Sequence, residues 1–223
     1  MKRIVVVSGH YGSGKTEFAV NLALRQAGRD EKVALADLDV VNPYFRSREK
    51  RALLENAGVT VIGSSTGADS GADLPALSAQ VHAPLQDPES RTILDVGGDA
   101  VGARLLGRYK HFLGPESSEL FVVVNTSRPE TRTVADLIAQ IRAIEAASGL
   151  TATGLVNNSH MLEFTQVYHL EEGDAVCRET ADELGIPVVF LSAREAILPR
   201  IPEELLGERL SIGMYLREAW MYA

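Results

Sequence analysis

Gly9-His-Tyr-Gly-Ser-Gly-Lys-Thr16 is the stretch of this chain that says most about its fold. Its glycines at the first and sixth places, followed by Lys15 and Thr16, match the phosphate-binding pattern Gly-x-x-x-x-Gly-Lys-Thr. Gly9, Gly12 and Gly14 permit backbone conformations and close approaches that a Cβ would obstruct, so the loop amides can surround phosphate oxygens. In this pattern the lysine contacts the β- and γ-phosphates, and the threonine hydroxyl binds magnesium.

The residues on both sides of this loop fit a nucleotide-binding role. Ile4–Val7 is a β-branched run typical of a buried parallel strand, and Glu17–Leu24 has the apolar spacing of a helix that Gly28 can end. The alternative, a glycine-rich turn with an incidental lysine, is less favoured because strand, loop and helix follow in the required order. We expect these residues to hold a nucleotide: Gly9, Gly12, Ser13, Gly14, Lys15, Thr16 and Glu17.

Length, composition and charge narrow the class of protein. The 223 residues fit one α/β domain spanning 1–223, and 45% hydrophobic with 23% charged residues is ordinary for a globular chain. A net charge of −8 argues against broad adhesion to nucleic acid or anionic lipid. Cys177 is the only cysteine, so no intrachain disulfide can form, and we expect its side chain to pack in the core as a small apolar residue. The first strand starts at once and no apolar run suits a membrane span, so we expect a cytoplasmic protein.

Short apolar runs alternate with helical patterns along the chain. The predicted strands are 3–8, 32–37, 59–62, 92–95, 120–125, 152–157 and 187–191, and the predicted helices are 14–27, 46–57, 73–81, 100–112, 130–147, 171–184 and 203–221. This alternation predicts an α/β fold with a mostly parallel, doubly wound sheet covered by helices on both faces, as in Rossmann-like P-loop NTPases. Ligands of such sheets bind at the carboxyl ends of the strands. The polar stretch 63–73 is expected to be a solvated connection rather than a substrate loop.

Carboxylates follow two of the predicted strands. Asp39 is a candidate to orient an attacking water, the alternative being a turn carboxylate before Asn42. Asp95 ends an apolar strand in a Walker B arrangement that can hold magnesium, and Gly98 gives the Asp-x-x-Gly spacing of a γ-phosphate switch. Asp99 either supports the metal site or caps the next helix. The predicted catalytic residues are Lys15, Asp39 and Asp95, and the predicted magnesium ligands are Thr16, Asp39 and Asp95.

Asparagines end the sixth predicted strand, where they can contact a purine. Asn157 and Asn158 are the candidates for this contact. Guanine-specific GTPases carry Asn-Lys-x-Asp at this point, and His160 stands here in place of the aspartate, so adenine is favoured. Ser192 and Ala193 either bring backbone against the base or form a simple turn.

These residues together resemble the MinD/ParA/CobQ/CobB group of P-loop ATPases, within the SIMIBI class. The likeness runs from the phosphate loop through Ala36-Asp-Leu-Asp39 to Leu94-Asp-Val-Gly-Gly98, and more weakly to Leu155-Val-Asn-Asn158. It implies a sheet protein that binds ATP with Mg²⁺ and forms a homodimer around the nucleotide. By this resemblance Gly9 to Thr16 carry the phosphates, Asp39 positions water, Asp95 serves magnesium, and Asn157 or Asn158 contacts adenine.

The loop departs from the family pattern Lys-Gly-Gly-x-Gly-Lys-Thr. His10 replaces the first lysine, which in the family reaches the partner's phosphates, and Tyr11 replaces a glycine. Histidine is shorter and largely neutral at pH 7, so it does not supply that charge. A metal-delivery role also lacks its Cys-x-Cys ligand pair. Arg46 or Arg48 can serve as an arginine finger in cis, the alternative being solvent-facing charges; without one, turnover of about 10⁻⁴ to 10⁻² per second is expected.

The C-terminal stretch 208–223 invites comparison with the basic amphipathic membrane helix that ends MinD proteins. Arg209 and Arg217 are offset by Glu208 and Glu218, so no basic face forms. We therefore expect this stretch to pack against the domain or a partner subunit, without binding a membrane.

The favoured function is a slow, Mg²⁺-dependent ATPase that acts as a nucleotide-dependent switch for an unidentified protein partner. The alternative is a small-molecule kinase or an ATP-dependent ligase, which use the same loop. Kinases usually carry an arginine-rich lid, whereas here only scattered arginines follow: Arg128, Arg132, Arg194 and Arg200. A third possibility, a nucleotide-binding scaffold without hydrolysis, applies if Asp39 does not face the phosphates.

Overall fold

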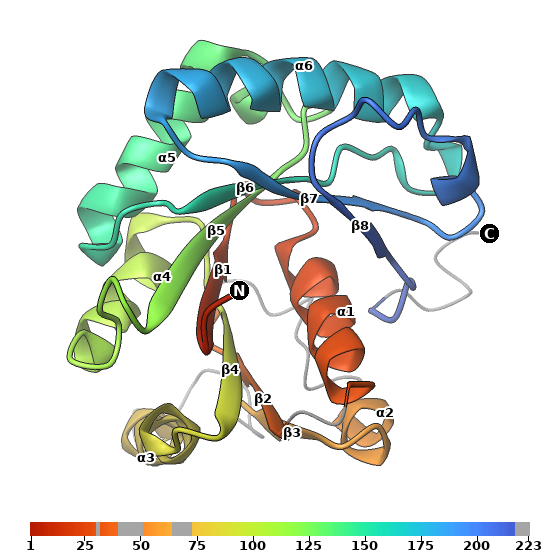
Figure 1. Ribbon diagram of the computed structural model, residues 1–223. Helices are drawn as coiled ribbons and strands as arrows, with labels where there is room; N and C mark the ends of the chain where they lie inside the picture. Colours follow the sequence, from red (N-terminus) through yellow and green to blue (C-terminus); the bar gives the residue numbers. More distant parts are fainter. Residues whose placement is uncertain (30–31, 40–50, 64–72, 217–223) are drawn as a thin grey trace.

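The computed structural model describes residues 1–29, 32–39, 51–63 and 73–216, and all their strands belong to one parallel sheet (Figure 1). The strands lie in the order β3-β2-β4-β1-β5-β6-β7-β8, and every neighbouring pair is parallel. Their bounds are β1 Ile4–Ser8, β2 Lys32–Asp37, β3 Val59–Ile62, β4 Ser90–Asp95, β5 Ser118–Val124, β6 Gly154–Asn157, β7 Val188–Ala193 and β8 Glu208–Ser211. The predicted α/β fold class is confirmed.

Helices cover both faces of the sheet because successive side chains of a buried strand point in opposite directions. Ile4 and Val6 of β1 face one core, and Val5 and Val7 face the other. One face packs against α1 (Lys15–Ala27) and α2 (Arg51–Asn56). The other packs against α3 (Asp73–Gln86), α5 (Val134–Ser148) and α6 (Val167–Leu184), and α4 (Ala100–Leu105) lies against α5. Short 3₁₀ turns occupy Leu106–Tyr109, Pro129–Thr131, Leu162–Phe164 and Leu198–Arg200.

The predicted helix over 203–221 is wrong in the part that the structure describes. Residues 208–211 form β8, whose Leu210 lies opposite Ser192 of β7. Gly207 allows this approach: its φ is 94°, and a Cβ there would lie 2.6 Å from the carbonyl carbon of Phe190. Pairing with a strand distant in sequence, not a local apolar pattern, therefore determines this element.

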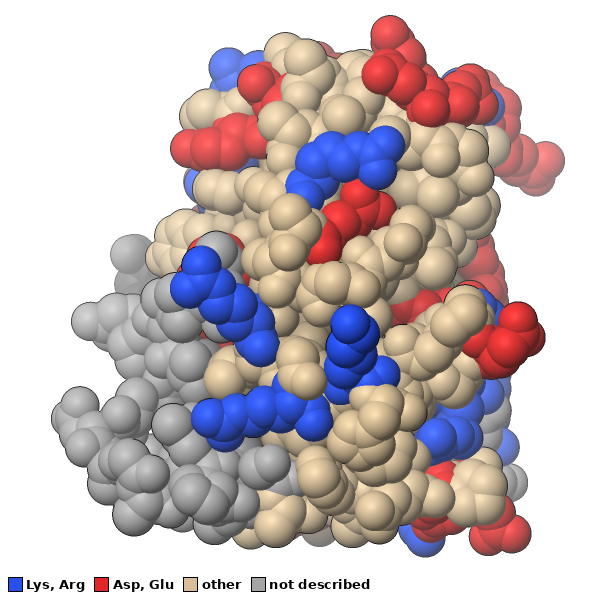
Figure 2. Space-filling model, turned by 90° about the vertical axis from the view of Figure 1, so that its left-hand side faces the viewer, with Lys and Arg blue, Asp and Glu red and all other residues tan. Residues whose placement is uncertain are grey.

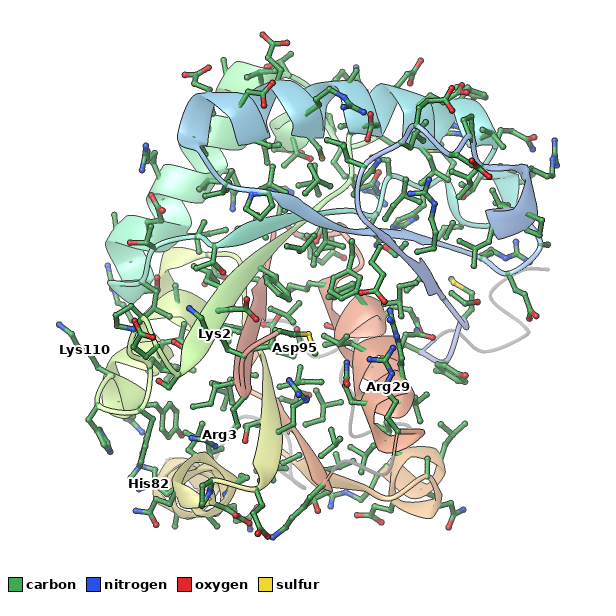
Figure 3. The ribbon with its side chains drawn as sticks, in the orientation of Figure 1. Lys2, Arg3, Arg29, His82, Asp95 and Lys110 are labelled. Atoms are coloured by element: carbon green, nitrogen blue, oxygen red, sulfur yellow. The ribbon has the colours of Figure 1, made fainter. Side chains whose placement is uncertain are left out.

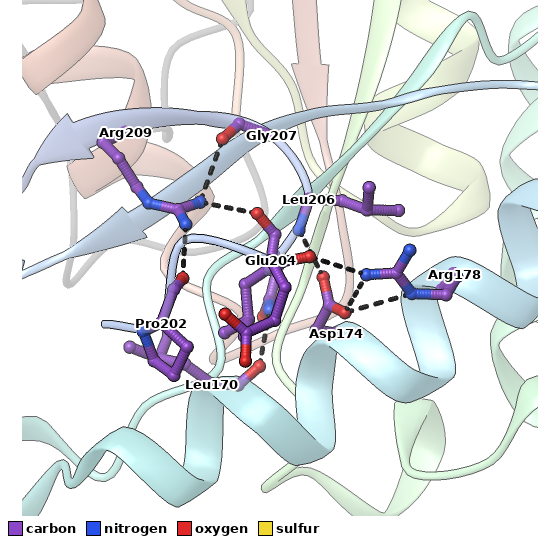
Figure 4. Close-up of polar contacts among 10 residues, drawn as sticks. Leu170, Asp174, Arg178, Pro202, Glu204, Leu206, Gly207 and Arg209 are labelled. Carbon is purple, nitrogen blue, oxygen red and sulfur yellow. Dashed lines mark hydrogen bonds and ion pairs between the residues drawn. The ribbon is translucent and has the colours of Figure 1, made fainter. Parts of the chain in front are cut away.

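Polar contacts hold the connection between β7 and β8 in place (Figure 4). Asp174 of α6 accepts a hydrogen bond from the backbone N–H of Leu206 at 2.7 Å and another from Arg178 at 2.8 Å. Arg209 donates to three backbone carbonyls of the connection, those of Pro202, Leu205 and Gly207. The connection is thereby anchored to both α6 and β8, which positions the residues after β8 beside α1.

Several predicted features lie outside the described residues. They are Arg46 and Arg48, the central part of the polar stretch 63–73, and the chain after Leu216. Cys177 is completely buried in the core of the face covered by α6, which confirms its prediction as a packed residue. Among the helices that the structure describes, none combines the length and the apolar character needed to cross a membrane.

Candidate functional site

The phosphate loop lies between the end of β1 and the start of α1. Gly12 and Gly14 adopt left-handed conformations, with φ of 76° and 82°, which a residue with a Cβ adopts only with strain. The backbone N–H of Ser13 donates to the His10 carbonyl at 3.0 Å, which closes the loop. Helix α1 begins immediately afterwards at Lys15, so its positive N-terminus faces the loop, as anion binding requires.

Lys15 lies among carboxylates at the carboxyl edge of the sheet. Its Nζ is 3.0 Å from Oδ2 of Asp39, and both side chains are almost completely buried. Burial opposes the charge of Lys15, but Asp95, Asp39 and Asp37 together outweigh it and raise the pKa of Lys15. The lysine is therefore a fixed positive charge, and Asp39 faces the phosphate loop as predicted.

Asp95 ends β4 opposite Val7 of β1, at the middle of the molecule (Figure 3). Its side chain is completely buried, and burial raises its pKa from 3.8 to about 6, although Lys15 and the Thr16 hydroxyl act in the opposite direction. Neither carboxylate oxygen accepts a hydrogen bond of ordinary geometry from any residue that the structure describes. A buried carboxylate with so few hydrogen-bond donors would be stabilised by a bound cation.

Thr16 and Asp95 fit a magnesium ion held mainly by water and phosphate. Magnesium takes oxygen ligands, keeps several waters, and is commonly bound by one or two protein groups together with substrate phosphates. The described part of the chain contains no group of three or more His, Cys, Asp or Glu side chains arranged to hold a metal without such help. The Thr16 hydroxyl and the buried Asp95 carboxylate next to the phosphate loop match this mode of binding.

Gly98 lies directly against the phosphate loop. A Cβ at this position would be 1.9 Å from the carbonyl oxygen of Gly9, so only glycine fits. Gln140 of α5 donates to the Gly98 carbonyl at 3.0 Å. Asp99 accepts the backbone N–H of Gly102 at 2.7 Å, so of its two predicted roles the structure supports the helix cap at the start of α4. The segment after β4 therefore joins the loop to two helices.

Asn157, the last residue of β6, and Asn158, which follows it, make different contacts. Asn157 is completely buried, donates to the Leu170 carbonyl at 2.9 Å and accepts the N–H of Ser159, so it does not face the phosphate loop. Asn158 donates to the Ser13 carbonyl at 2.7 Å and accepts the Ser192 hydroxyl at 2.6 Å. Of the two asparagines, only Asn158 lines the cavity beside the loop, and it ties the loop to the ends of β6 and β7.

Glu17 has a different position from the one expected of a phosphate ligand. Its carboxylate accepts the backbone N–H groups of Tyr215 and Leu216, at 2.6 and 3.2 Å. Glu17 thus contacts the segment after β8, and this segment becomes a wall of the site.

A cavity of about 220 Å³ extends from the phosphate loop. Its lining combines residues of the phosphate loop with aliphatic side chains. The lining residues are Tyr11, Gly12, Gly14, Lys15, Thr16, Glu17, Arg128, Asn158, Ser159, His160, Leu162, Thr165, Ser192, Ala193, Arg194, Ile212, Met214 and Leu216. This mixture of phosphate-loop and aliphatic lining suits a ligand that joins phosphates to a flat, weakly polar group.

Sequence reasoning missed two residues that support the loop from β5 and the turn after it. Asn125 donates to the Gly12 carbonyl at 3.3 Å and accepts the N–H of His160 at 3.1 Å. Arg128 also donates to the Gly12 carbonyl, through Nε at 3.3 Å. Asn125 carried the same signal as the asparagines of β6, a polar residue directly after a buried strand, whereas Arg128 carried none.

No family model and no curated protein sequence matches this chain. Solved structures do. The FtsY structure from Thermotoga maritima, a cell division protein, is 24% identical with a TM-score of 0.56, and the match covers 86% of this chain and 62% of that one. The signal recognition particle receptor FtsY of Elizabethkingia anophelis is 21% identical with a TM-score of 0.55, over 84% of this chain and 57% of that one.

A chloroplast FtsY from Physcomitrella patens gives a TM-score of 0.58 at 19% identity, with 86% of this chain and 58% of that one covered. This chain thus spans about three fifths of the length of the structures that it matches. Membership of the SIMIBI class and of its MinD/ParA group stays a prediction, because these structures are at most 24% identical to this chain. At these identities the likeness concerns the fold, and the chain has the parallel α/β fold of the P-loop NTPases.

Proposed function

We propose that this chain is a single nucleotide-binding domain that binds ATP with Mg²⁺, hydrolyses it slowly and changes its contact with a protein partner as it does so. The observation that carries the proposal is the buried group below the phosphate loop. There Lys15 pairs with Asp39 at 3.0 Å, beside Asp95 and Thr16. A fixed positive charge, two carboxylates and a hydroxyl next to loop amides form the set that phosphoryl transfer to water requires.

The Lys15–Asp39 pair suggests how each side chain acts. An incoming triphosphate supplies Lys15 with a new anionic partner, so Asp39 is released to orient a water molecule toward the γ-phosphate. Asp95 and Thr16 would hold the magnesium ion, which supplies charge neutralisation at the phosphate oxygens when bound. Arg46 and Arg48, the candidate arginine fingers, lie outside the described residues; if neither acts in this way, turnover of about 10⁻⁴ to 10⁻² per second is expected.

Gly98 provides the physical basis for the switch. It touches the Gly9 carbonyl, and Gln140 and the Asp99 cap connect it to α5 and α4. A γ-phosphate that draws the Gly98 amide inward would therefore move the start of α4 relative to α5. Figure 2 shows Lys and Arg side chains gathered over the middle of the face that carries these helices, which is unusual on a chain of net charge −8. We propose this face as the contact with the partner.

Adenine is the proposed base because the cavity offers guanine no carboxylate acceptor. Among its described lining residues Glu17 is the only acid, and its carboxylate already accepts two backbone N–H groups. Counted from Asn158, the aspartate place of Asn-Lys-x-Asp falls on Met161, so no acid appears there either. One FtsY receptor was solved in complex with GDP, so competition between ATP and GTP for the wild-type protein is a direct test. Tighter binding of GTP would contradict the adenine assignment.

The test of the proposed function is binding and hydrolysis of Mg²⁺-ATP by the wild-type protein and by Lys15→Ala. Loss of the ammonium removes charge-assisted hydrogen bonds to phosphate and leaves Asp39 and Asp95 without their cation, so affinity should fall about 100-fold. Lys110→Ala is the matched control, because this lysine points away from the molecule in Figure 3. Undiminished affinity in Lys15→Ala would refute the proposal.

The kinase alternative gains one observation from the structure. Arg128 and Arg194, which are 66 positions apart in the sequence, both line the cavity and can contact a transferred phosphoryl group. Phosphate release from ATP in buffer supports the switch, whereas transfer that occurs only after addition of a metabolite extract supports a kinase. Binding without either reaction supports the scaffold.

A further inference from the structure

The residues after β8 cross helix α1 and form a segment that we name the C-terminal strap, residues 212–216. It starts where the N–H of Ile212 donates to the Ala193 carbonyl at 2.8 Å. Asn21 of α1 then pairs with Gly213 in both directions. Its Nδ2 donates to the Gly213 carbonyl at 2.9 Å, and its Oδ1 accepts the Gly213 N–H at 2.7 Å. One side chain thereby satisfies both backbone groups of a residue 192 positions away.

Glu17 holds the next part of the strap. Both of its carboxylate oxygens are used, one by the N–H of Tyr215 and one by the N–H of Leu216. Hydrogen bonds to a charged acceptor are stronger than those between neutral groups. Glu17 and Asn21 are four residues apart, so they lie on the same face of α1 and act on the strap together.

The strap is shaped to present its apolar side chains to the cavity. A Cβ at Gly213 would lie 2.7 Å from the ring of Tyr215, so a larger residue at that position would displace this ring of the strap. Ile212, Met214 and Leu216 all line the cavity, and Leu162 and Ala193 are its other aliphatic lining residues. Three of the five aliphatic lining residues therefore belong to the strap and depend on its docking.

We infer that Glu17 and Asn21 are positioning residues that hold the C-terminal strap as the apolar wall of a purine subsite, so that base binding and strap docking support each other. The inference rests on the proposed nucleotide binding. The phosphate loop is closed by its own hydrogen bonds and by Asn125 and Asn158, none of which involves the strap. Loss of the strap should consequently weaken the contact with the base and leave the phosphate contact intact.

Two ligands separate these contributions: Mg²⁺-ATP, which has phosphates and a base, and Mg²⁺-tripolyphosphate, which has phosphates alone. Their dissociation constants are measured by calorimetry for the wild-type protein, Glu17→Ala, Asn21→Ala and Gly213→Ala. The first two variants disturb the strap from α1, and the third disturbs it from the strap itself. Glu183→Gln, an exposed site on α6, is the control for loss of one negative charge.

Each strap variant is expected to bind ATP about tenfold more weakly, because only the docked fraction of molecules presents the apolar wall. Tripolyphosphate affinity should change less than twofold, and Glu17→Gln should recover part of the ATP affinity because its amide oxygen still accepts a hydrogen bond. Equal losses for both ligands, or undiminished ATP affinity, would overturn the inference. Failure of the wild-type protein to bind ATP, or unchanged binding of both ligands by Lys15→Ala, would instead refute the proposed function.

Discussion

Replacement of Asp95 by asparagine should stabilise the nucleotide-free protein while it abolishes hydrolysis. Asp95 is completely buried at the end of β4, and its oxygens accept no hydrogen bond of ordinary geometry from the described residues. Burial therefore disfavours the charged form and raises the pKa from 3.8 to about 6, although Lys15 and Thr16 favour the charge. Above that pH the folded protein must hold a carboxylate in an unfavourable place.

The size of this effect follows from the two pKa values. The unfolded chain loses the proton near pH 3.8, and the folded chain keeps it until about pH 6. Between these values the folded state binds more protons, so its stability falls as the pH rises and then levels off. Each unit of difference between the folded and unfolded pKa corresponds to about 1.4 kcal/mol, so the full loss of folding free energy is about 3 kcal/mol. About 2 kcal/mol of this loss appears between pH 4.5 and 7.5.

The measurement is urea unfolding of nucleotide-free wild type and Asp95→Asn at pH 4.5 and 7.5. The difference in unfolding free energy between the two proteins should grow by about 2 kcal/mol from the lower to the higher pH, or about 4–8 °C in Tm. Any packing effect of the amide is independent of pH and cancels in this comparison. Asp182→Asn, on the exposed face of α6, is the control and should show no such growth. A pH-independent difference for Asp95→Asn would refute the reasoning.

Three further substitutions test the arrangement of the site. Asp39→Asn should bind ATP about three- to tenfold more tightly, because Lys15 loses its competing carboxylate, yet hydrolyse it about 100-fold more slowly; calorimetry and phosphate release check both effects. Gly98→Ala should lower the unfolding free energy by about 1–3 kcal/mol, since its Cβ meets a loop carbonyl, whereas Gly107→Ala, with nothing within 4 Å, should not. Asn158→Ala should weaken ATP binding about tenfold, because the hydrogen bond to the Ser13 carbonyl of the loop is lost. Equal weakening by a substitution at an exposed site away from the loop would argue against this role.

The phosphate loop and the neighbouring strands could be predicted because their signals are local. Glycines at 9, 12 and 14 are required by the backbone conformation or packing of the loop itself, and the strands 32–37 and 59–62 have the predicted bounds. Continuous apolar runs of this length are typical of buried parallel strands. The position of Asp39 and Asp95 near Lys15 could also be predicted, because parallel strands bring their carboxyl ends to one edge of the sheet.

Other parts of the site depended on contacts that sequence patterns do not report. Residues 208–211 form a strand because β7 offers a free edge and Gly207 allows close approach, whereas their own composition favours no strand. The choice between Asn157 and Asn158 depends on which of two neighbouring side chains faces the loop, and successive side chains of a strand point in opposite directions. Only the register of β6 in the sheet decides this.

The sequence by itself determined the phosphate-loop pattern ahead of the first helix, because its glycines, lysine and threonine are contiguous. The tertiary structure alone decided what surrounds it. Glu17 directly follows Thr16 of the phosphate-loop pattern in the chain, yet its carboxylate accepts the N–H of Leu216, 199 positions away. The physical reason is that the walls of the cavity come from strand ends and from the C-terminal strap, which the parallel sheet brings together across the whole length of the chain.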